Sequence, residues 1–448
     1  MTRSILTILS GTAGAALFLF ARNLALAALL PVEQYGIATT FALAMAAVEM
    51  AMASGVQAQI VQARDGDDPD LQAALQGFQA LRGLIAAAAL AAAAGPVARW
   101  LGIPEVAWAY RALALIPVLN GLQNLDVHRL NRAGRFAPLA LSQTLPAALA
   151  LPLAAGLAAW LQDWRALLWA MLAQAAMALA ITHLTAARPF RFGIDRMAWT
   201  RVMVFGWPIL ANTLVVFAVM QGDRLAVGRV LGMEVLGVFS MGVTLTLTPA
   251  LVLASTLRIS LLPGLSAAGA DRFPALARRA IRVSLALSAL ASATAAAAPA
   301  VVGALVAGTG FAALPALLLP LGLVQAARLA QASTTVAALA LGATGNAAAT
   351  SLPRLLAVGA GAVWLARGGG VEAVIWLAVA AETLGAGISA GLLRRRAPGL
   401  ALPRGAYAGA ALAALAAGLS APEHWWAGAG AALGCAALIA AKMRRAAS

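Results

Sequence analysis

Lysine and cysteine are almost absent from this chain of 448 residues. Its only lysine is Lys442, its only cysteine is Cys435, and histidine occurs three times, at His128, His183 and His424. A Walker A loop needs Gly-Lys-Ser/Thr to hold phosphates, so the chain has no such loop. One cysteine permits neither an intrachain disulfide nor a cysteine cage, and the histidines lie far apart in sequence. The sequence therefore predicts no cofactor and no metal site.

Charged side chains are also scarce. They make up 10% of the chain, against about 25% in soluble domains. Apolar residues make up 62%, and the mean hydropathy is +0.87. So few charges could not cover the surface of a soluble protein of this size, which indicates an integral membrane protein. The net charge of +15 lies in short loops between apolar runs, and this pattern argues against a nucleic-acid partner.

The apolar runs are long enough to be membrane-spanning helices, which need about 20 mostly apolar residues. They are apolar throughout, whereas barrel strands alternate polar and apolar residues. The sequence predicts an all-α polytopic membrane protein with about 14 transmembrane helices. Their expected limits are 5–29, 37–60, 76–98, 107–127, 138–160, 165–187, 202–222, 236–262, 279–303, 311–333, 347–366, 372–393, 405–421 and 425–441.

The basic residues give the expected orientation. With the N-terminus in the cytoplasm, 21 of the 31 basic residues lie at cytoplasmic helix ends, and five lie in the opposite loops. Positive charge is enriched in cytoplasmic loops, so this split predicts a multi-pass protein of the bacterial inner membrane with both termini in the cytoplasm. All loops are short, which argues against a folded catalytic domain. The five basic residues of the opposite loops are Arg99, Arg165, Arg224, Arg229 and Arg367.

An internal repeat is visible. Leu30-Pro-Val-Glu-Gln-Tyr-Gly-Ile37 follows the first expected helix, and Leu231-Gly-Met-Glu-Val-Leu-Gly-Val238 follows the seventh, with an offset of 201 residues. Six helices lie between the copies, so both halves share one orientation and are expected to be related by a pseudo-twofold axis along the membrane normal. The expected organisation is an N-terminal six-helix lobe (1–200), a second six-helix lobe (201–396) and two extra helices (397–448).

The repeated segment has the residues of a helical turn. Pro31 and Gly232 are expected to break the helix. Glu33 can cap the helix that follows, so a structural role is favoured over a catalytic one. Gly36 and Gly237 can allow close packing of helices.

These motifs resemble those of the polysaccharide (O-antigen or exopolysaccharide) flippases of the multidrug/oligosaccharidyl-lipid/polysaccharide exporter superfamily. The resemblance rests on the turn Leu29–Gly36, on Phe205-Gly-Trp-Pro208, on Gln221-Gly-Asp-Arg224 and on Leu236-Gly237. It rests also on the expected helix order of six plus six plus two.

The resemblance implies a function and partners. Such proteins move undecaprenyl-diphosphate-linked oligosaccharides across the inner membrane by alternating access, for cell-surface polysaccharide biosynthesis. The implied partners are this lipid-linked glycan and membrane lipids, and an association with a polysaccharide polymerase and glycosyltransferases is left open. The protein is not expected to be an enzyme.

Charged side chains within the apolar segments are the candidate site residues, since a charge at mid-helix costs roughly 2.5–3.5 kcal/mol. A diphosphate needs donors that stay charged in a low dielectric, which favours arginine. Buried structural ion pairs are the open alternative for these arginines. The expected substrate-binding residues are Arg22, Asn23, Arg258 and Arg328. The expected coupling or gating residues are Glu49, which could pair with Arg22 or bind a cation, and Asp223 and Arg224.

Three alternatives remain open. A cation-coupled multidrug exporter of the same superfamily is disfavoured by fourteen helices and a basic set of candidate residues. A membrane glycosyltransferase or polymerase is disfavoured by the short loops and by the lack of a placed carboxylate pair. A scaffold without transport would not explain arginines buried in both halves.

Overall fold

The computed structural model describes residues 2–52, 56–63, 65–269, 271–343, 345–419 and 424–445, and all regular elements in these ranges are helical. Side chains of residues 2–13, 58, 62, 197–198, 201–212, 214 and 442–445 are not described. Of the motif residues and basic residues used above, some therefore lie outside the described residues or side chains: Phe205–Pro208 of the motifs, and Arg3, Arg64, Arg201, Lys442, Arg444 and Arg445 of the 21 cytoplasmic basic residues.

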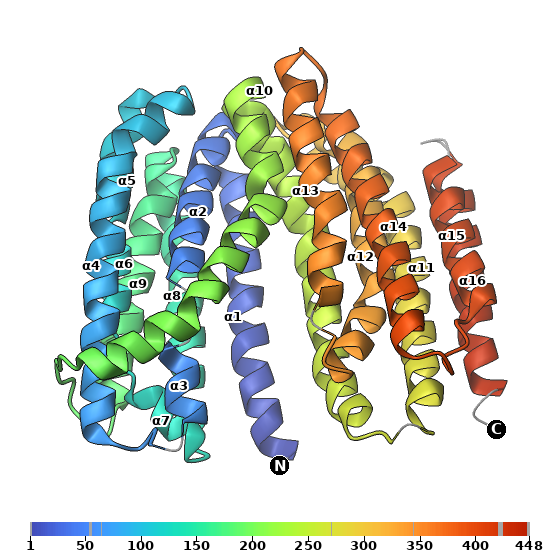
Figure 1. Ribbon diagram of the computed structural model, residues 1–448. Helices are drawn as coiled ribbons and strands as arrows, with labels where there is room; N and C mark the ends of the chain where they lie inside the picture. Colours follow the sequence, from blue (N-terminus) through green and yellow to red (C-terminus); the bar gives the residue numbers. More distant parts are fainter. Residues whose placement is uncertain are drawn as a thin grey trace. The chain divides into compact units, whose positions relative to one another are not determined.

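The helices follow the apolar runs of the sequence (Figure 1). Those of the first half are α1 (Thr2–Leu29), α2 (Val32–Ala51), α3 (Val56–Gln62), α4 (Pro69–Trp100), the 3-10 turn Pro104–Val106, α5 (Ala107–Leu113), α6 (Leu115–Gly121), α7 (Asp126–Arg132), α8 (Ala137–Leu161) and α9 (Arg165–Thr185). The others are α10 (Arg196–Ser266), α11 (Phe273–Val306), α12 (Leu314–Ala340), α13 (Gly345–Ala366), α14 (Val371–Arg396), α15 (Arg404–Leu419) and α16 (Trp425–Arg445).

The chain is an all-α membrane protein. Eight helices within the described residues are long and apolar enough to cross a membrane, and Gly14–Leu29 and Trp425–Ala441 are shorter apolar helices. The expected total of about 14 spans stays a prediction, because the length and composition of the described helices identify only eight clear spans. The described helices nevertheless begin and end close to the expected limits in most of the chain, but the expected span 37–60 is wrong, because α2 ends at Ala51 and α3 begins at Val56.

The expected continuous helix over 107–127 is wrong. The structure breaks this segment into α5 and α6 at Ala114, and α6 ends at Gly121. Pro117 has no backbone N–H and its ring crowds the carbonyl group four residues earlier, so one straight helix cannot run through it. The carbonyl oxygens of Asn120 and Gly121 accept hydrogen bonds from the amide of Gln79 on α4. The helix can end there because this side chain satisfies its last carbonyl groups.

The two copies of the repeat both form the expected helical break. Pro31, with φ −54° and ψ 145°, separates α1 from α2, and Glu33 lies in the first turn of α2, where the helix dipole favours a carboxylate. Gly232 interrupts α10 with φ 86° and ψ 178°, a conformation that glycine adopts at little cost. The expectation from the sequence is thus confirmed at both positions, although no side chain at the N-cap position caps α2.

Gly36 and Gly237 are packed against each other. A β-carbon on Gly36 would collide with the backbone carbonyl of Met233, and one on Gly237 would lie 2.5 Å from the carbonyl oxygen of Val32. Only glycine lets the starts of the two helical segments approach this closely. The predicted close packing is therefore confirmed.

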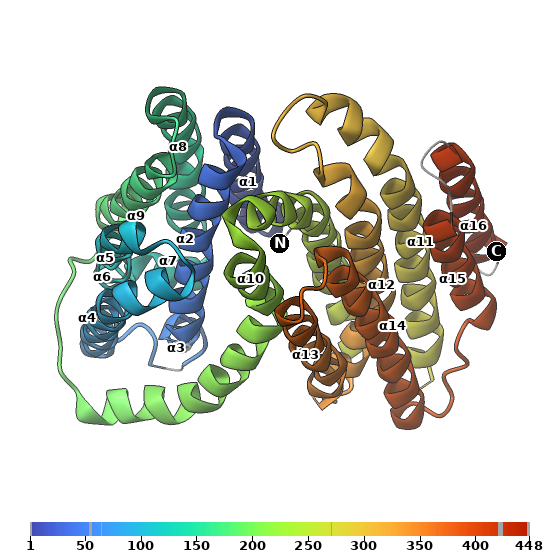
Figure 2. The ribbon, with the colours of Figure 1, turned by 90° about the horizontal axis from the view of Figure 1, so that it is seen from above.

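Contacts divide the chain into two compact units. Unit 1 comprises Met1–Gln221 and Leu231–Gly237, and unit 2 comprises Gly222–Val230 and Val238–Ser448. In unit 1, α1 packs along α8, and α8 along α9. In unit 2, α11 packs on α12 and also on α15 and α16, which lie side by side (Figures 1 and 2). The core of unit 2 is rich in alanine, so its helices approach closely.

Candidate functional site

Arg22 is a buried charge of unit 1. It lies on α1, 7% of it is exposed, and its Nη1 donates a 2.8 Å hydrogen bond to Oε1 of Gln174 on α9. Its Nε has no hydrogen-bond partner. No described carboxylate forms an ion pair with Arg22. The alternative that this arginine belongs to a buried structural ion pair is therefore not supported by the described residues. The neighbouring Asn23 is half-buried.

Arg82 on α4 is a second arginine of unit 1 with unused donors. Its Nε and Nη1 are buried without a hydrogen-bond partner. Its guanidinium lies 5.9 Å from the ring centroid of Phe78, within the range of a cation–π contact. Arg22 and Arg82 thus both have buried nitrogen atoms without a hydrogen-bond partner, and neither forms an ion pair with a described carboxylate.

Glu49 on α2 does not pair with Arg22. The residue is exposed, and Arg22 donates its described hydrogen bond to Gln174 instead. Its role in coupling stays a prediction.

The arginines of unit 2 lie in a different environment. Glu382 on α14, 2% exposed, accepts a hydrogen bond of 2.7 Å from Nε of Arg328 on α12 and one of 2.7 Å from Nε of Arg354 on α13. A nitrogen of Arg354 also donates to Oε1 of Gln331, at 2.8 Å. We call Arg328, Arg354, Glu382 and Gln331 the Glu382 cluster. It joins three helices through one buried carboxylate.

Asp223 adds a second carboxylate near this cluster. It lies on the part of α10 that belongs to unit 2 and interacts electrostatically with Arg224 and Arg328. The backbone N–H of Arg224 donates to its Oδ1 at 2.7 Å. Three arginines and two carboxylates therefore interact here, and the cation of Arg328 has an anionic partner within the protein.

Arg258 lies farther along α10, on an exposed face of unit 2. Its neighbours Ser255, Thr256 and Ile259 are exposed too. Among the described residues it forms no ion pair. The structure thus leaves the charges of Arg22 and Arg258 unneutralised, while it joins Arg328 to a carboxylate.

The sequence does not show the partners of these charges. Glu382 and Arg354 are charges within apolar segments, and Gln174 and Gln331 carry no comparable signal. A usable signal was present: three successive helices carry Arg328, Arg354 and Glu382 in their apolar runs, and charges of both signs at such depth tend to pair.

Unit 2 also has a large apolar cavity of about 620 Å³ between α11, α12, α14 and α15. Tyr407, Thr383 and Ser288 are among the few polar residues at its wall. Its other walls are mostly aliphatic or aromatic and include Leu285, Leu323, Trp376, Leu415 and Leu419.

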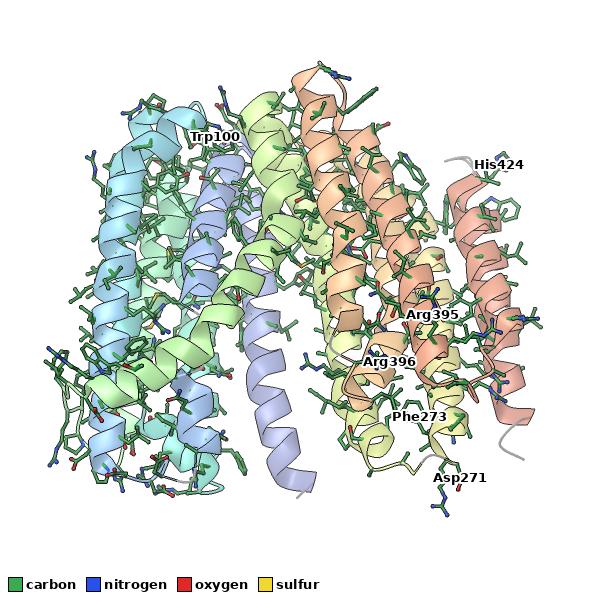
Figure 3. All side chains as sticks on the ribbon, in the orientation of Figure 1. Trp100, Asp271, Phe273, Arg395, Arg396 and His424 are labelled. Carbon is green, nitrogen blue, oxygen red and sulfur yellow. The ribbon has the colours of Figure 1, made fainter. Side chains whose placement is uncertain are left out.

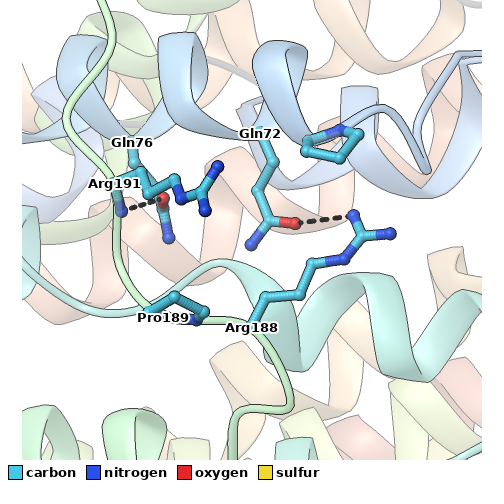
Figure 4. A pocket seen from close by; sticks show the side chains of 6 residues that line it. Gln72, Gln76, Arg188, Pro189 and Arg191 are labelled. Carbon is cyan, nitrogen blue, oxygen red and sulfur yellow. Dashed lines mark hydrogen bonds between the residues drawn. The ribbon is translucent and has the colours of Figure 1, made fainter.

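A smaller pocket of about 180 Å³ lies in unit 1, where the segment after α9 crosses the start of α4 (Figure 4). Arg188 donates to Oε1 of Gln72 at 3.4 Å, and the backbone N–H of Arg191 donates to Oε1 of Gln76 at 3.2 Å. Gln76 in turn donates to Asn124 at 2.8 Å. The pocket's polar side chains are largely used to hold this segment in place.

Asp126 anchors the same segment. Its carboxylate is fully buried and accepts from Nε of Arg129 at 2.6 Å and from the backbone N–H groups of Ala187 and Arg188 at 2.7 and 3.1 Å. Burial alone would raise the pKa of Asp126, but these hydrogen bonds outweigh it and lower the pKa below its ordinary value. On the same short helix, burial lowers the pKa of His128 to about 4, so this histidine is neutral at pH 7. Among the described residues, no three His, Cys, Asp or Glu side chains gather to hold a metal ion.

Comparison with known proteins gives a family and a fold. The family described as "Polysaccharide biosynthesis protein" matches residues 25–313. The structure resembles that of the lipid II flippase MurJ in an inward closed conformation, with a TM-score of 0.70, 12% sequence identity, and 98% of this chain and 99% of that chain covered. It also resembles an inward-facing multidrug resistance transporter of the MATE family, with a TM-score of 0.68, 16% identity, and 86% and 95% covered. No curated protein sequence matches the chain.

Proposed function

Since the chain belongs to the family of polysaccharide biosynthesis proteins and has the fold of the MATE transporters and MurJ, we propose that it is a flippase for polyprenyl-diphosphate-linked oligosaccharides. Its place would be the bacterial inner membrane, with both termini in the cytoplasm. It would transport this substrate by alternating access of two lobes, for cell-surface polysaccharide biosynthesis.

The observation that carries this proposal is the uncompensated charge of Arg22. A guanidinium that is 7% exposed in an apolar unit is costly unless something compensates it. Its described hydrogen-bond partner is a neutral amide, and its Nε is unused. A diphosphate offers the charge and the paired oxygens that such a group needs. An electroneutral drug would not.

The apolar cavity of unit 2 is an argument for a substrate that carries a lipid chain. A polyprenyl chain is a long hydrocarbon, and the cavity of about 620 Å³ has a wall of leucine, alanine and tryptophan side chains. Removing such a chain from water is favourable wherever it lies, in the bilayer or against this wall.

The remaining residues take proposed roles from their surroundings. Arg258 is exposed and forms no ion pair among the described residues, and both Arg258 and Asn23 are proposed to bind substrate. Arg328 would act through the Glu382 cluster and contact substrate only if this cluster rearranges. Glu49, Asp223 and Arg224 stay candidates for coupling or gating. The energy source would be a gradient, the membrane potential or trapping of the product, because the chain has no Walker A loop.

The proposal is tested in a strain that lacks the gene. The lipid-linked glycans are extracted after exposure of the cells to an impermeant periplasmic glycosidase. A complete glycan that accumulates and is protected from the enzyme supports a flippase. Arg22→Ala and Arg258→Ala should fail to restore access to the enzyme. Arg111→Gln, which changes an exposed arginine of α5, should restore it at equal protein level.

Two outcomes would contradict the proposal. An unchanged lipid-linked pool together with new drug sensitivity would indicate a multidrug exporter. A shortened glycan would indicate a glycosyltransferase or polymerase.

A further inference from the structure

A second arginine-lined pocket lies at the end of unit 2, where α12 and α14 end and α13 begins. Its volume is about 280 Å³, and α12 contributes Ala338 while α13 contributes Gly345, Asn346 and Ala349. The end of α14 contributes Leu392, Leu393, Arg395 and Arg396. Figure 3 shows the two arginines toward the end of α14. The walls are small and apolar except at Asn346 and the two arginines.

Asn346, which lines this pocket, has an unused acceptor. It is 6% exposed, and its Nδ2 donates to the backbone carbonyl of Ser389 at 3.5 Å. Its Oδ1 is buried and has no hydrogen-bond partner. The contact with Ser389 fixes the orientation of the amide, because the flipped amide would place two oxygens against each other. A buried acceptor without a partner is costly, so this oxygen calls for a donor from a ligand.

The two arginines present unused donors. Arg395 and Arg396 are exposed, and among the described residues neither forms an ion pair or a side-chain hydrogen bond. No acidic side chain lines the pocket. The positive end of the α13 dipole lies at the same place, since Gly345 begins that helix. A ligand that complements the pocket would therefore have one anionic group and, beside it, one hydrogen-bond donor.

The surroundings favour a lipid as the source of these groups. The three helices that form the pocket are long and apolar enough to span a membrane, and their ends are the places where headgroups lie. Leu339 and Leu341, just after the α12 residue that lines the pocket, are 37% and 42% exposed. Acyl chains could therefore lie on apolar surface while the headgroup occupies the pocket.

We propose that this pocket binds the headgroup of an anionic glycerophospholipid that carries a hydroxyl group, such as phosphatidylglycerol. The phosphodiester accepts hydrogen bonds from Arg395 and Arg396. A glycerol hydroxyl donates to Oδ1 of Asn346. The site is separate from Arg22 and does not depend on the transported substrate.

The experiment uses the full chain, purified in a detergent that removes bound lipid and titrated with dioctanoyl phosphatidylglycerol under native mass spectrometry. Arg395→Gln/Arg396→Gln should weaken binding roughly 20-fold, because each arginine near a membrane surface contributes about fivefold. Arg394→Gln/Arg404→Gln removes the same charge from two exposed arginines outside the pocket and should change binding by less than about twofold.

Asn346 is tested by the choice of lipid. Phosphatidylmethanol has the same charge but lacks the hydroxyl group, so the unaltered chain should bind it about fivefold more weakly. Asn346→Leu should abolish this preference and leave binding of phosphatidylmethanol unchanged. Melting curves of each variant check that the fold is intact.

Three results would overturn the proposal. An equal loss of binding in the Arg394/Arg404 variant would mean diffuse attraction by surface charge. Equal binding of the two lipids by the unaltered chain would remove the role of Asn346. Glycerol 1-phosphate binding as tightly as the lipid would exclude a lipid as the source.

Discussion

Unit 1 and unit 2 both hold buried or half-buried arginines within apolar helices, but the arginines have different partners. Arg22 in unit 1 contacts a neutral amide, whereas Arg328 and Arg354 in unit 2 share the carboxylate of Glu382. A buried charge is tolerated when it is paired within the protein or when a ligand pairs with it. The difference separates a paired cluster in unit 2 from a charge in unit 1 that we propose a ligand neutralises.

The largest expected effect comes from breaking the Glu382 cluster. Glu382→Gln leaves two arginines without their shared carboxylate, which should lower the free energy of unfolding by about 3–5 kcal/mol. Thermal unfolding of the purified chain in detergent measures it. Glu372→Gln, an exposed carboxylate in the first turn of the same helix, is the matched control and should stay within about 0.5 kcal/mol. Equal melting temperatures of the two variants would mean that the cluster does not hold unit 2 together.

The next effect concerns the contact of the two repeat copies. Gly36→Ala places a β-carbon against the carbonyl of Met233, so it should destabilise by about 1–3 kcal/mol and reduce transport. Gly156→Ala on α8 meets no atom within 4 Å and should be neutral or stabilising. The melting temperature and the leaflet assay measure both variants. A Gly36→Ala chain as stable and active as the unaltered chain would contradict the close packing described here.

A smaller effect should depend on pH. The lowered pKa of Asp126 means that its carboxylate stabilises the fold above its ordinary pKa of 3.8, and that this contribution disappears as the pH falls through the lower folded value. Asp126→Asn should therefore unfold about 1–2 kcal/mol more easily at pH 7. Below about pH 3.8 the difference should shrink. Unfolding at a series of pH values measures it, and a difference that does not vary with pH would show that the charge of Asp126 is not what anchors the segment after α9.

Much of the fold follows from local signals. Pro31 and Gly232 mark breaks because their backbones suit a turn, and Gly36 and Gly237 are glycine because a carbonyl group approaches each. The break at Ala114 is harder to predict, because the apolar run there is continuous. Pro117 alone does not mark it, since α4 and α8 also contain internal prolines and are not broken there.

The partners of the buried charges could not be predicted in the same way. Arg22 and Gln174 are separated by 152 residues, and their meeting depends on the rotation of α1 and α9 about their axes. The apolar runs are so uniform that periodicity does not define this rotation. The presence of charges within the spans was therefore predictable, while their pairing was not.

The central claim is that the charge of Arg22 serves a ligand rather than the fold. The most direct test compares melting temperatures of the unaltered chain and of Arg22→Met, with and without farnesyl diphosphate as a short polyprenyl diphosphate. The account predicts that Arg22→Met is at least as stable without ligand, because it removes a charge that no described carboxylate neutralises. It also predicts that the diphosphate raises the melting temperature of the unaltered chain only. A variant that melts far lower and still responds to the diphosphate would contradict it.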